Sequence, residues 1–122
     1  MAGLRTRVTC TFRFEAAHRL AWHPGKCRNL HGHSYRLDVT LEGPLDANGV
    51  VLDFDVLHEV VQREVIERFD HQDLNQLVEN PTAELLAHEI WAVLTTAGIE
   101  PTALRLWETA DSWVDVISES NS

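Results

Sequence analysis

The chain contains no apolar run of membrane-spanning length, only two cysteines and few basic residues. Its first residues, Met-Ala-Gly-Leu-Arg, lack the apolar stretch of a signal peptide, so neither a membrane protein nor an exported protein is expected. Two cysteines, Cys10 and Cys27, do not form a disulfide framework, and we expect reduced thiols in a cytoplasmic protein. The 122 residues are enough for one domain, 1–122, with a buried core.

Basic residues are unevenly placed as well as scarce. Lys and Arg number 10 against 19 Asp and Glu, which gives a net charge of −9. Residues 1–36 hold seven basic residues and one acid, whereas residues 37–122 hold three basic residues and eighteen acids. The acidic balance argues against a nucleic-acid partner. The basic third would attract a small anionic substrate such as a phosphate ester, unless these side chains merely cover an exposed strand.

Three of the four histidines in residues 18–33, within this basic third, form a ligand-like pattern. His31 and His33 are two apart, so on a strand both project from one face, and Gly32 between them adds no side chain. His18 ends the preceding strand-like segment. Three imidazoles with an open fourth position are typical of catalytic zinc, although another divalent metal stays possible. We expect these three residues to bind Zn²⁺.

The other histidines, His23, His58 and His88, match no ligand pattern and are interpreted as ordinary surface or core residues. Cys27 allows three interpretations. It could be a small buried residue, as we expect of Cys10. Between Lys26 and Arg28 it could be a reactive thiolate, and near the histidines it could be a fourth ligand that closes a structural zinc site.

Apolar–polar alternation predicts strands over 8–15, running on through 16–18, and over 35–42, and two final strands over 102–108 and 112–117. Between them, apolar spacings of three and four predict two helices. The order ββααββ indicates an α+β fold with a four-stranded antiparallel sheet and two helices on one face. Its unpaired outer strands favour pairing with another copy, so we expect an oligomer.

The first helix is expected to begin at Asp53 or Asp55 and to end near Phe69. The second is expected to begin within 80–84, with Asn80 or Thr82 as its cap, and to stop at Gly98. Residues 70–75 are predicted to be an irregular connection, and residues 118–122 are expected to fray.

Two weaker signals lie outside the histidine cluster. Asp70 and His71 could form a general-base pair, but adjacent residues in a helix do not face each other, so the backbone there must leave helical geometry. Glu108 ends an apolar strand, where its carboxylate could accept two hydrogen bonds from an amidine-like edge of a heterocycle. The alternatives are a surface Asp-His pair and a solvated strand end.

Taken together, five segments resemble the 6-pyruvoyl-tetrahydropterin synthase family. They are Phe14-Glu-Ala-Ala-His18, Cys27-x-x-x-His31-Gly-His33, Phe69-Asp-His-Gln-Asp-Leu-Asn75, Asn80-Pro-Thr-Ala-Glu84 and Trp107-Glu-Thr109. The three residues between Cys27 and His31 resemble the bacterial 6-carboxy-5,6,7,8-tetrahydropterin synthases of the queuosine pathway, whereas the biopterin-forming enzymes have a longer gap.

The resemblance implies the tunnelling fold (T-fold) and a homohexamer of two stacked trimers, with Asp70 and His71 reaching Cys27 of a neighbouring subunit. It also implies zinc on His18, His31 and His33, a general-base role for Cys27, and pterin binding by Glu108, assisted by Thr82.

The implied reaction converts 7,8-dihydroneopterin triphosphate to 6-carboxy-5,6,7,8-tetrahydropterin, with loss of acetaldehyde and triphosphate. Arg19, Lys26 and Arg28 are candidates for the triphosphate. Two alternatives stay open: formation of 6-pyruvoyl-tetrahydropterin, and a non-catalytic zinc-binding oligomeric module.

Overall fold

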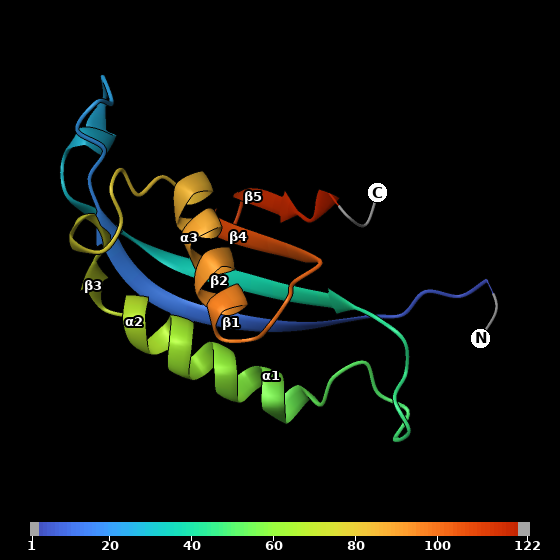
Figure 1. Cartoon of the computed structure of the whole chain (residues 1–122). Helices are drawn as coiled ribbons and strands as arrows, with labels where there is room; N and C mark the ends of the chain where they lie inside the picture. Colours follow the sequence, from blue (N-terminus) through green and yellow to red (C-terminus); the bar gives the residue numbers. More distant parts are fainter. Residues whose placement is uncertain (1–2, 120–122) are drawn as a thin grey trace.

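The computed structural model describes residues 3–119, in which a five-stranded sheet carries its helices on one face (Figure 1). Two long strands, β1 (Arg7–His18) and β2 (His31–Glu42), pair antiparallel along their whole length. Strand β4 (Ala103–Thr109) follows beside β2, and β5 (Ser112–Ile117) forms the outer edge. The predicted fold class is confirmed. Most of the segment expected to fray, residues 118–122, falls on 120–122, which lie outside the described residues.

The sheet has one strand more than predicted. Residues Gln72–Asp73 form β3, which pairs in parallel with Ala16 and Ala17 and gives the order β3-β1-β2-β4-β5. The prediction of an irregular connection over 70–75 was therefore incomplete, since 3₁₀ helix η3 (Leu74–Gln76) also lies there. A strand of two residues is too short to show the alternation by which sequence reveals strands.

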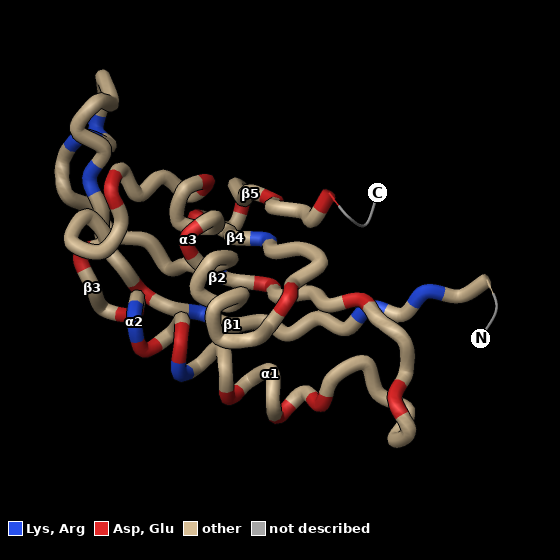
Figure 2. The backbone as a smooth tube through the Cα atoms, in the orientation of Figure 1, with Lys and Arg blue, Asp and Glu red and all other residues tan. Residues whose placement is uncertain are grey.

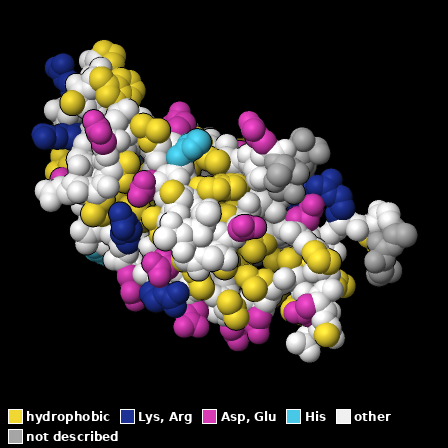
Figure 3. Space-filling view, viewed as in Figure 1, with side chains coloured by type: hydrophobic (Ala, Val, Ile, Leu, Met, Phe, Trp, Pro, Cys, Tyr) yellow, Lys and Arg dark blue, Asp and Glu magenta, His cyan; other side chains and the backbone are white. Residues whose placement is uncertain are grey.

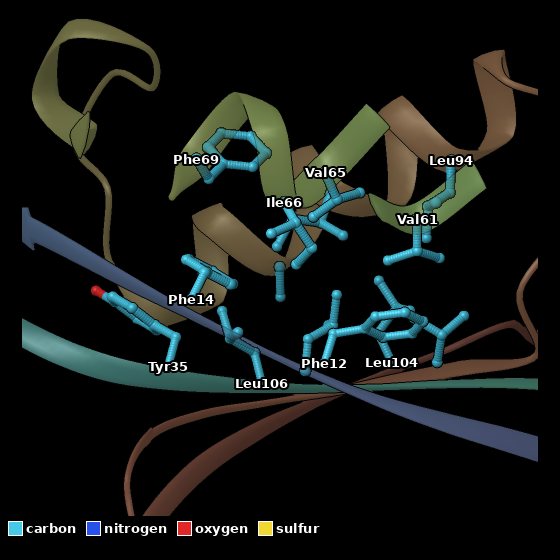
Figure 4. Close-up of a cluster of buried hydrophobic side chains, with 14 of the residues drawn as sticks. Phe12, Phe14, Tyr35, Val61, Val65, Ile66, Phe69, Leu94, Leu104 and Leu106 are labelled. Atoms are coloured by element: carbon cyan, nitrogen blue, oxygen red, sulfur yellow. The ribbon is translucent and has the colours of Figure 1, made fainter. Parts of the chain in front are cut away.

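The core lies between the sheet and the helices (Figure 4). Alternate residues of the strands point toward the helices, so the sheet contributes one buried side chain in two. The sheet residues of this core are Cys10, Phe12, Phe14, Ala16, Tyr35, Leu37, Val39, Leu104 and Leu106. Those from the helices include Leu57, Val61, Val65, Phe69, Leu86, Ile90 and Leu94.

The first helix spans the predicted range but is not regular. It consists of α1 (Phe54–Val61), a π-helical segment η2 (Gln62–Ile66) and α2 (Glu67–Phe69). Its buried residues Leu57, Val61, Val65 and Phe69 are each four apart. A regular α-helix of 3.6 residues per turn would rotate such a series away from the core, whereas a wider π turn keeps it aligned. The π segment thus delivers Asp70 to the end of β1.

The second helix, α3 (Ala83–Thr96), begins at the predicted cap. Thr82 Oγ1 accepts a hydrogen bond from the Leu85 N–H at 3.1 Å, and the helix ends before Gly98, whose φ of 93° is readily adopted only by glycine. No helix among residues 3–119 has the length and apolar character needed to span a membrane.

Charge is distributed as the sequence indicates (Figure 2). Lys26 and Arg28 lie in the connection between β1 and β2, residues 19–30, which projects from one end of the sheet and includes η1 (Lys26–Arg28). Acidic residues are prominent along α1 and its continuation. The space-filling view shows hydrophobic side chains beside the basic ones on the projecting connection (Figure 3).

Candidate metal centre and active site

The three histidines predicted as ligands are brought together where β1 ends and β2 begins. His18 and His31 are direct cross-strand partners, and His33 follows on the same face of β2. One ring nitrogen from each lies within 4.8 Å of those from the other two. Among the described residues, this is the group of histidine, cysteine and acidic side chains that could hold a metal ion.

The backbone fixes which ring nitrogens face the centre. His18 Nδ1 lies 2.7 Å from the Pro81 carbonyl oxygen, and His31 Nδ1 lies 2.8 Å from that of Asn29. Because a carbonyl only accepts, each Nδ1 carries the proton and each Nε2 of the neutral ring presents a lone pair. These two Nε2 atoms are 3.1 Å apart. Two facing lone pairs repel unless a cation lies between them.

His33 also favours a cation at this centre. Its Nε2 is buried and has no hydrogen-bond partner among the described residues. Burial lowers the pKa of His33, and the neighbouring His18 and His31 add to this, against an opposing effect of Glu108. The neutral ring is the form that binds metal. Three neutral imidazoles with converging nitrogens fit a tetrahedral zinc ion, in which ligand nitrogens are roughly 3.3 Å apart.

Glu108 lies beside this centre. Its carboxylate oxygens are 3.7 Å from His33 Nε2 and 3.9 Å from His18 Nε2. It also lines a cavity of about 250 Å³, together with Thr82 at the start of α3. The structure therefore brings the predicted ring-binding pair, Glu108 and Thr82, to one cavity that adjoins the histidines.

Tyr35 is a neighbour of the centre to which the sequence analysis gave no role. Its hydroxyl lies 3.5 Å from His18 Nδ1, and its side chain is buried. Burial, together with the negative charge of Glu108, raises the pKa of the Tyr35 hydroxyl, so it stays protonated. Its position two residues after His33 on β2 is the signal that could have placed it beneath the histidines.

Cys27 lies in η1, just before strand β2, which carries His31 and His33. Its carbonyl accepts a hydrogen bond from the Leu20 N–H at 2.8 Å, and its side chain is half-buried. Its Sγ is not part of the compact ligand group, so the geometry does not favour Cys27 as a fourth, closing ligand. Both cysteines are free, as the composition predicts, and burial raises the pKa of the Cys10 thiol.

Asp70 and His71 do interact, and the backbone leaves helical geometry there. Asp70 has ψ of 133° and His71 has φ of 59°, and His71 Nδ1 lies 2.9 Å from Asp70 Oδ2. The N–H of Glu15 donates to Asp70 Oδ1 at 2.8 Å, and the His71 N–H donates to the Glu15 carbonyl. The hydrogen bond from the Glu15 N–H, and to a lesser degree that from the His71 ring, lower the pKa of Asp70.

The Asp70–His71 pair borders a cavity on the face of the sheet opposite to the one that carries the histidine triad. His71 lines a cavity of about 480 Å³ with Glu15 and Ser34, and this cavity borders residues 32–34 of β2. The side chains of Glu15 and Ser34, joined by hydrogen bonds of 2.6 and 2.9 Å, alternate with core residues and so face away from the helices. His18, His31 and His33 share the phase of the buried residues.

The remaining candidates lie on the projecting connection. Arg19, Lys26 and Arg28 are exposed, and within residues 3–119 none of them forms an ion pair. The other histidines behave as ordinary side chains. His23 Nδ1 accepts from the Gly25 N–H, the His58 ring packs 5.1 Å from that of Phe12, and His88 is exposed on α3.

Comparison with known proteins places this site in a family. The 6-pyruvoyl tetrahydropterin synthase family matches residues 7–119. A 6-carboxy-5,6,7,8-tetrahydropterin synthase from Synechocystis is 43% identical over 95 residues, covering 72% of this chain and 74% of the relative. A dihydroneopterin monophosphate aldolase from Pyrococcus furiosus is 36% identical over 84 residues, covering 69% and 70%.

Among solved structures, the 6-pyruvoyl tetrahydropterin synthase of Caenorhabditis elegans superposes with a TM-score of 0.83 at 24% identity. The match covers 95% of this chain and 97% of that one, and it shows the shared fold. The family match over nearly the whole sequence agrees with the five sequence segments that predicted it. The chain therefore belongs to the 6-pyruvoyl tetrahydropterin synthase family.

Proposed function

We propose that the chain is a zinc-dependent lyase that converts 7,8-dihydroneopterin triphosphate and water to 6-carboxy-5,6,7,8-tetrahydropterin, releasing acetaldehyde and triphosphate. The observation that carries this proposal is the convergence of three imidazole nitrogens beside the Glu108 carboxylate and a small cavity. The Synechocystis relative, which is named a 6-carboxy-5,6,7,8-tetrahydropterin synthase, supports the choice of product. The three-residue gap from Cys27 to His31 supports it too.

His18, His31 and His33 would hold the zinc. When bound, zinc supplies Lewis acidity, which makes adjacent O–H and C–H groups of a substrate more acidic. The carbonyl oxygens of Pro81 and Asn29 hold two of the rings with Nε2 directed inward. Glu108 accepts two N–H bonds from the guanidine-like edge of the pterin, and Thr82 borders the same cavity.

The general base is assigned to Cys27, assisted by the Asp70–His71 pair. Asp70, fixed by the Glu15 N–H, holds the Nδ1 proton of His71, so that His71 Nε2 can exchange a proton with a partner. His71 shares its cavity with Glu15 and Ser34, whose side chains face away from the helices, so the pair is assigned to the site of a neighbouring subunit.

The assembly follows from the same reasoning. Strand β5 is an open edge on which Trp113 is 44% and Ile117 64% exposed, and such an edge favours pairing with another copy. We assign the protein to a homohexamer of two trimers with sites between subunits. We assign binding of the triphosphate to Arg19, Lys26 and Arg28. The activity is assigned to queuosine biosynthesis in the cytoplasm.

The test is product analysis. The zinc-loaded oligomer is incubated with 7,8-dihydroneopterin triphosphate, and products are identified by mass, with a His31→Ala variant as the control. Acetaldehyde together with the 6-carboxy product supports the proposal. A 6-pyruvoyl product without acetaldehyde would assign the chain to the other synthase activity.

Two further outcomes would contradict the proposal. Cleavage of dihydroneopterin monophosphate in a parallel incubation, with no turnover of the triphosphate, would match the activity for which the Pyrococcus relative is named. No turnover of either substrate, with a zinc ion held by four protein ligands, would indicate a non-catalytic zinc module. Metal analysis of the same sample distinguishes that case from loss of metal during purification.

A further inference from the structure

Trp22 is exposed, yet it is held in place. Its side chain is 60% exposed on the connection between β1 and β2. The indole Nε1–H donates a hydrogen bond of 2.6 Å to Asn80 Oδ1, 58 residues later in the chain. An exposed indole without such a tether would sample several rotamers, whereas this one is fixed in one orientation. Sequence reasoning gave Trp22 no role.

The tether of Trp22 is part of the turn that also orients a metal ligand. Asn80 has φ of 50°, a left-handed conformation that asparagine tolerates better than most residues, and its carbonyl accepts from the Thr82 N–H at 2.8 Å. The next residue, Pro81, provides the carbonyl that fixes His18. The turn 80–82 therefore sets the position of Trp22 relative to the metal centre.

Trp22 and Glu108 line the same cavity of about 250 Å³. Its other lining residues are Leu20, Thr82, Ala83, Glu84, Ser112, Trp113 and Val114. The volume lies below the range of about 300–1,000 Å³ typical of pockets for drug-sized ligands, so it fits a compact ring. Two tryptophans border the cavity, but the ring of Trp113 already packs against that of Trp107, with centroids 4.3 Å apart.

We propose that Trp22 is the aromatic wall of the ring-binding cavity, a positioning and specificity residue against which the planar bicyclic pterin stacks while Glu108 holds its edge. This inference rests on the proposed function, since it takes a pterin as the ligand. The basic connection could attract many anions. Stacking on an aromatic side chain would select, among them, those that carry a flat heterocycle. Asn80 holds the indole in its stacking orientation before the ligand arrives.

The test measures binding of neopterin, an oxidised pterin without a triphosphate, to the zinc-loaded oligomer by calorimetry. Trp22→Ala removes the wall, Trp22→Phe keeps an aromatic face without the N–H, and Asn80→Gly removes the tether while tolerating the left-handed backbone. Leu45→Ala, an exposed residue outside the cavity, is the matched control. Zinc content and oligomer size are measured for every variant.

We expect Trp22→Ala to raise the neopterin Kd roughly tenfold or more, as loss of one stacking contact does. Trp22→Phe and Asn80→Gly both lose the hydrogen bond between residues 22 and 80 but keep an aromatic ring, so the Kd of each should lie between those of the wild type and Trp22→Ala. Zinc content should not change. With 7,8-dihydroneopterin triphosphate, KM should rise more than kcat falls. Neopterin should quench the intrinsic fluorescence of Trp22→Phe less than that of the wild type, because only Trp113 of the two lining tryptophans remains.

Several outcomes would overturn this inference while leaving the proposed function standing. One is an unchanged Kd in Trp22→Ala, alongside normal neopterin binding by the wild type. Another is loss of zinc or of the oligomer in both Trp22 variants, which would make Trp22 a structural tether or a subunit contact. If the wild type bound no neopterin and turned over no pterin triphosphate, the inference would fail together with the proposed function.

Discussion

Asn75 forms both hydrogen bonds that its side-chain amide can make to the backbone of Arg19. Asn75 Oδ1 accepts from the Arg19 N–H at 2.8 Å, and Asn75 Nδ2 donates to the Arg19 carbonyl at 2.9 Å. The amide thus continues the contact of β3 with β1 two residues beyond the last pair, Ala17 and Asp73. It joins the segment that carries Asp70 and His71 to the residue that follows His18. Asn75 is the last residue of one of the segments that identified the family.

Replacing Asn75 by alanine should destabilise this junction. Loss of two partly exposed hydrogen bonds should lower the free energy of unfolding by about 1–2 kcal/mol, and two backbone groups of Arg19 would have to pair with water instead. Urea unfolding at equal protomer concentration measures the change. Gln76→Ala, an exposed neighbour in η3, is the control and should have little effect. Equal stability of both variants would show that Asn75 contributes nothing here.

Replacing Cys27 by alanine should separate metal binding from turnover. Because Cys27 Sγ lies outside the compact ligand group, Cys27→Ala should keep its zinc while kcat falls by roughly 10²–10⁴-fold, the range for loss of a general acid–base group. His31→Ala should lose both metal and activity. Metal analysis and steady-state kinetics on the same preparations check this. A fall of zinc content by half or more in Cys27→Ala would restore the interpretation of Cys27 as a structural ligand.

Sequence predicted the parts of the fold that depend on periodicity. Alternation in β1 and β2 gave the buried face and placed His31 and His33 together, because side chains two apart on a strand necessarily share a face. The π segment and β3 were not predicted. Spacings of four also occur in regular α-helices, so the apolar pattern did not reveal the π segment, and two residues of strand have no period.

The candidate site was predictable to a similar extent. The histidines share two adjacent strands, so local geometry alone brought them together. The Asp70–His71 contact required a positive φ at His71, which nothing in the residue type demands. Glu108 reaches the histidines only because β4 pairs with β2, a long-range choice that strand patterns do not encode.

Mixing two inactive variants should restore part of the activity. Cys27→Ala and His71→Ala subunits each lack one half of the proposed acid–base machinery. If Cys27 of one subunit meets His71 of another, random exchange after mild dissociation should give intact sites, up to about a quarter of the total in a closed symmetric ring. The assay compares kcat of the mixture with that of each variant treated alone. A mixture no more active than its components would place Cys27 and His71 of each site in one chain.

Asp70→Asn should destabilise the protein in a pH-dependent way. The Glu15 N–H and the His71 ring hold the pKa of Asp70 below its usual range, so the folded state favours the carboxylate. A group with a depressed pKa contributes stability that is fully present above its unfolded value, about 3.9, and is lost as the pH falls through the lower folded value. The gap in unfolding free energy between wild type and Asp70→Asn should therefore be widest at pH 5–7 and should narrow toward pH 3. Denaturant unfolding across this range measures it. A gap that stayed constant down to pH 3 would mean that the charge of Asp70 does not stabilise the turn, and its hydrogen bond from Glu15 would then act equally well through a neutral oxygen.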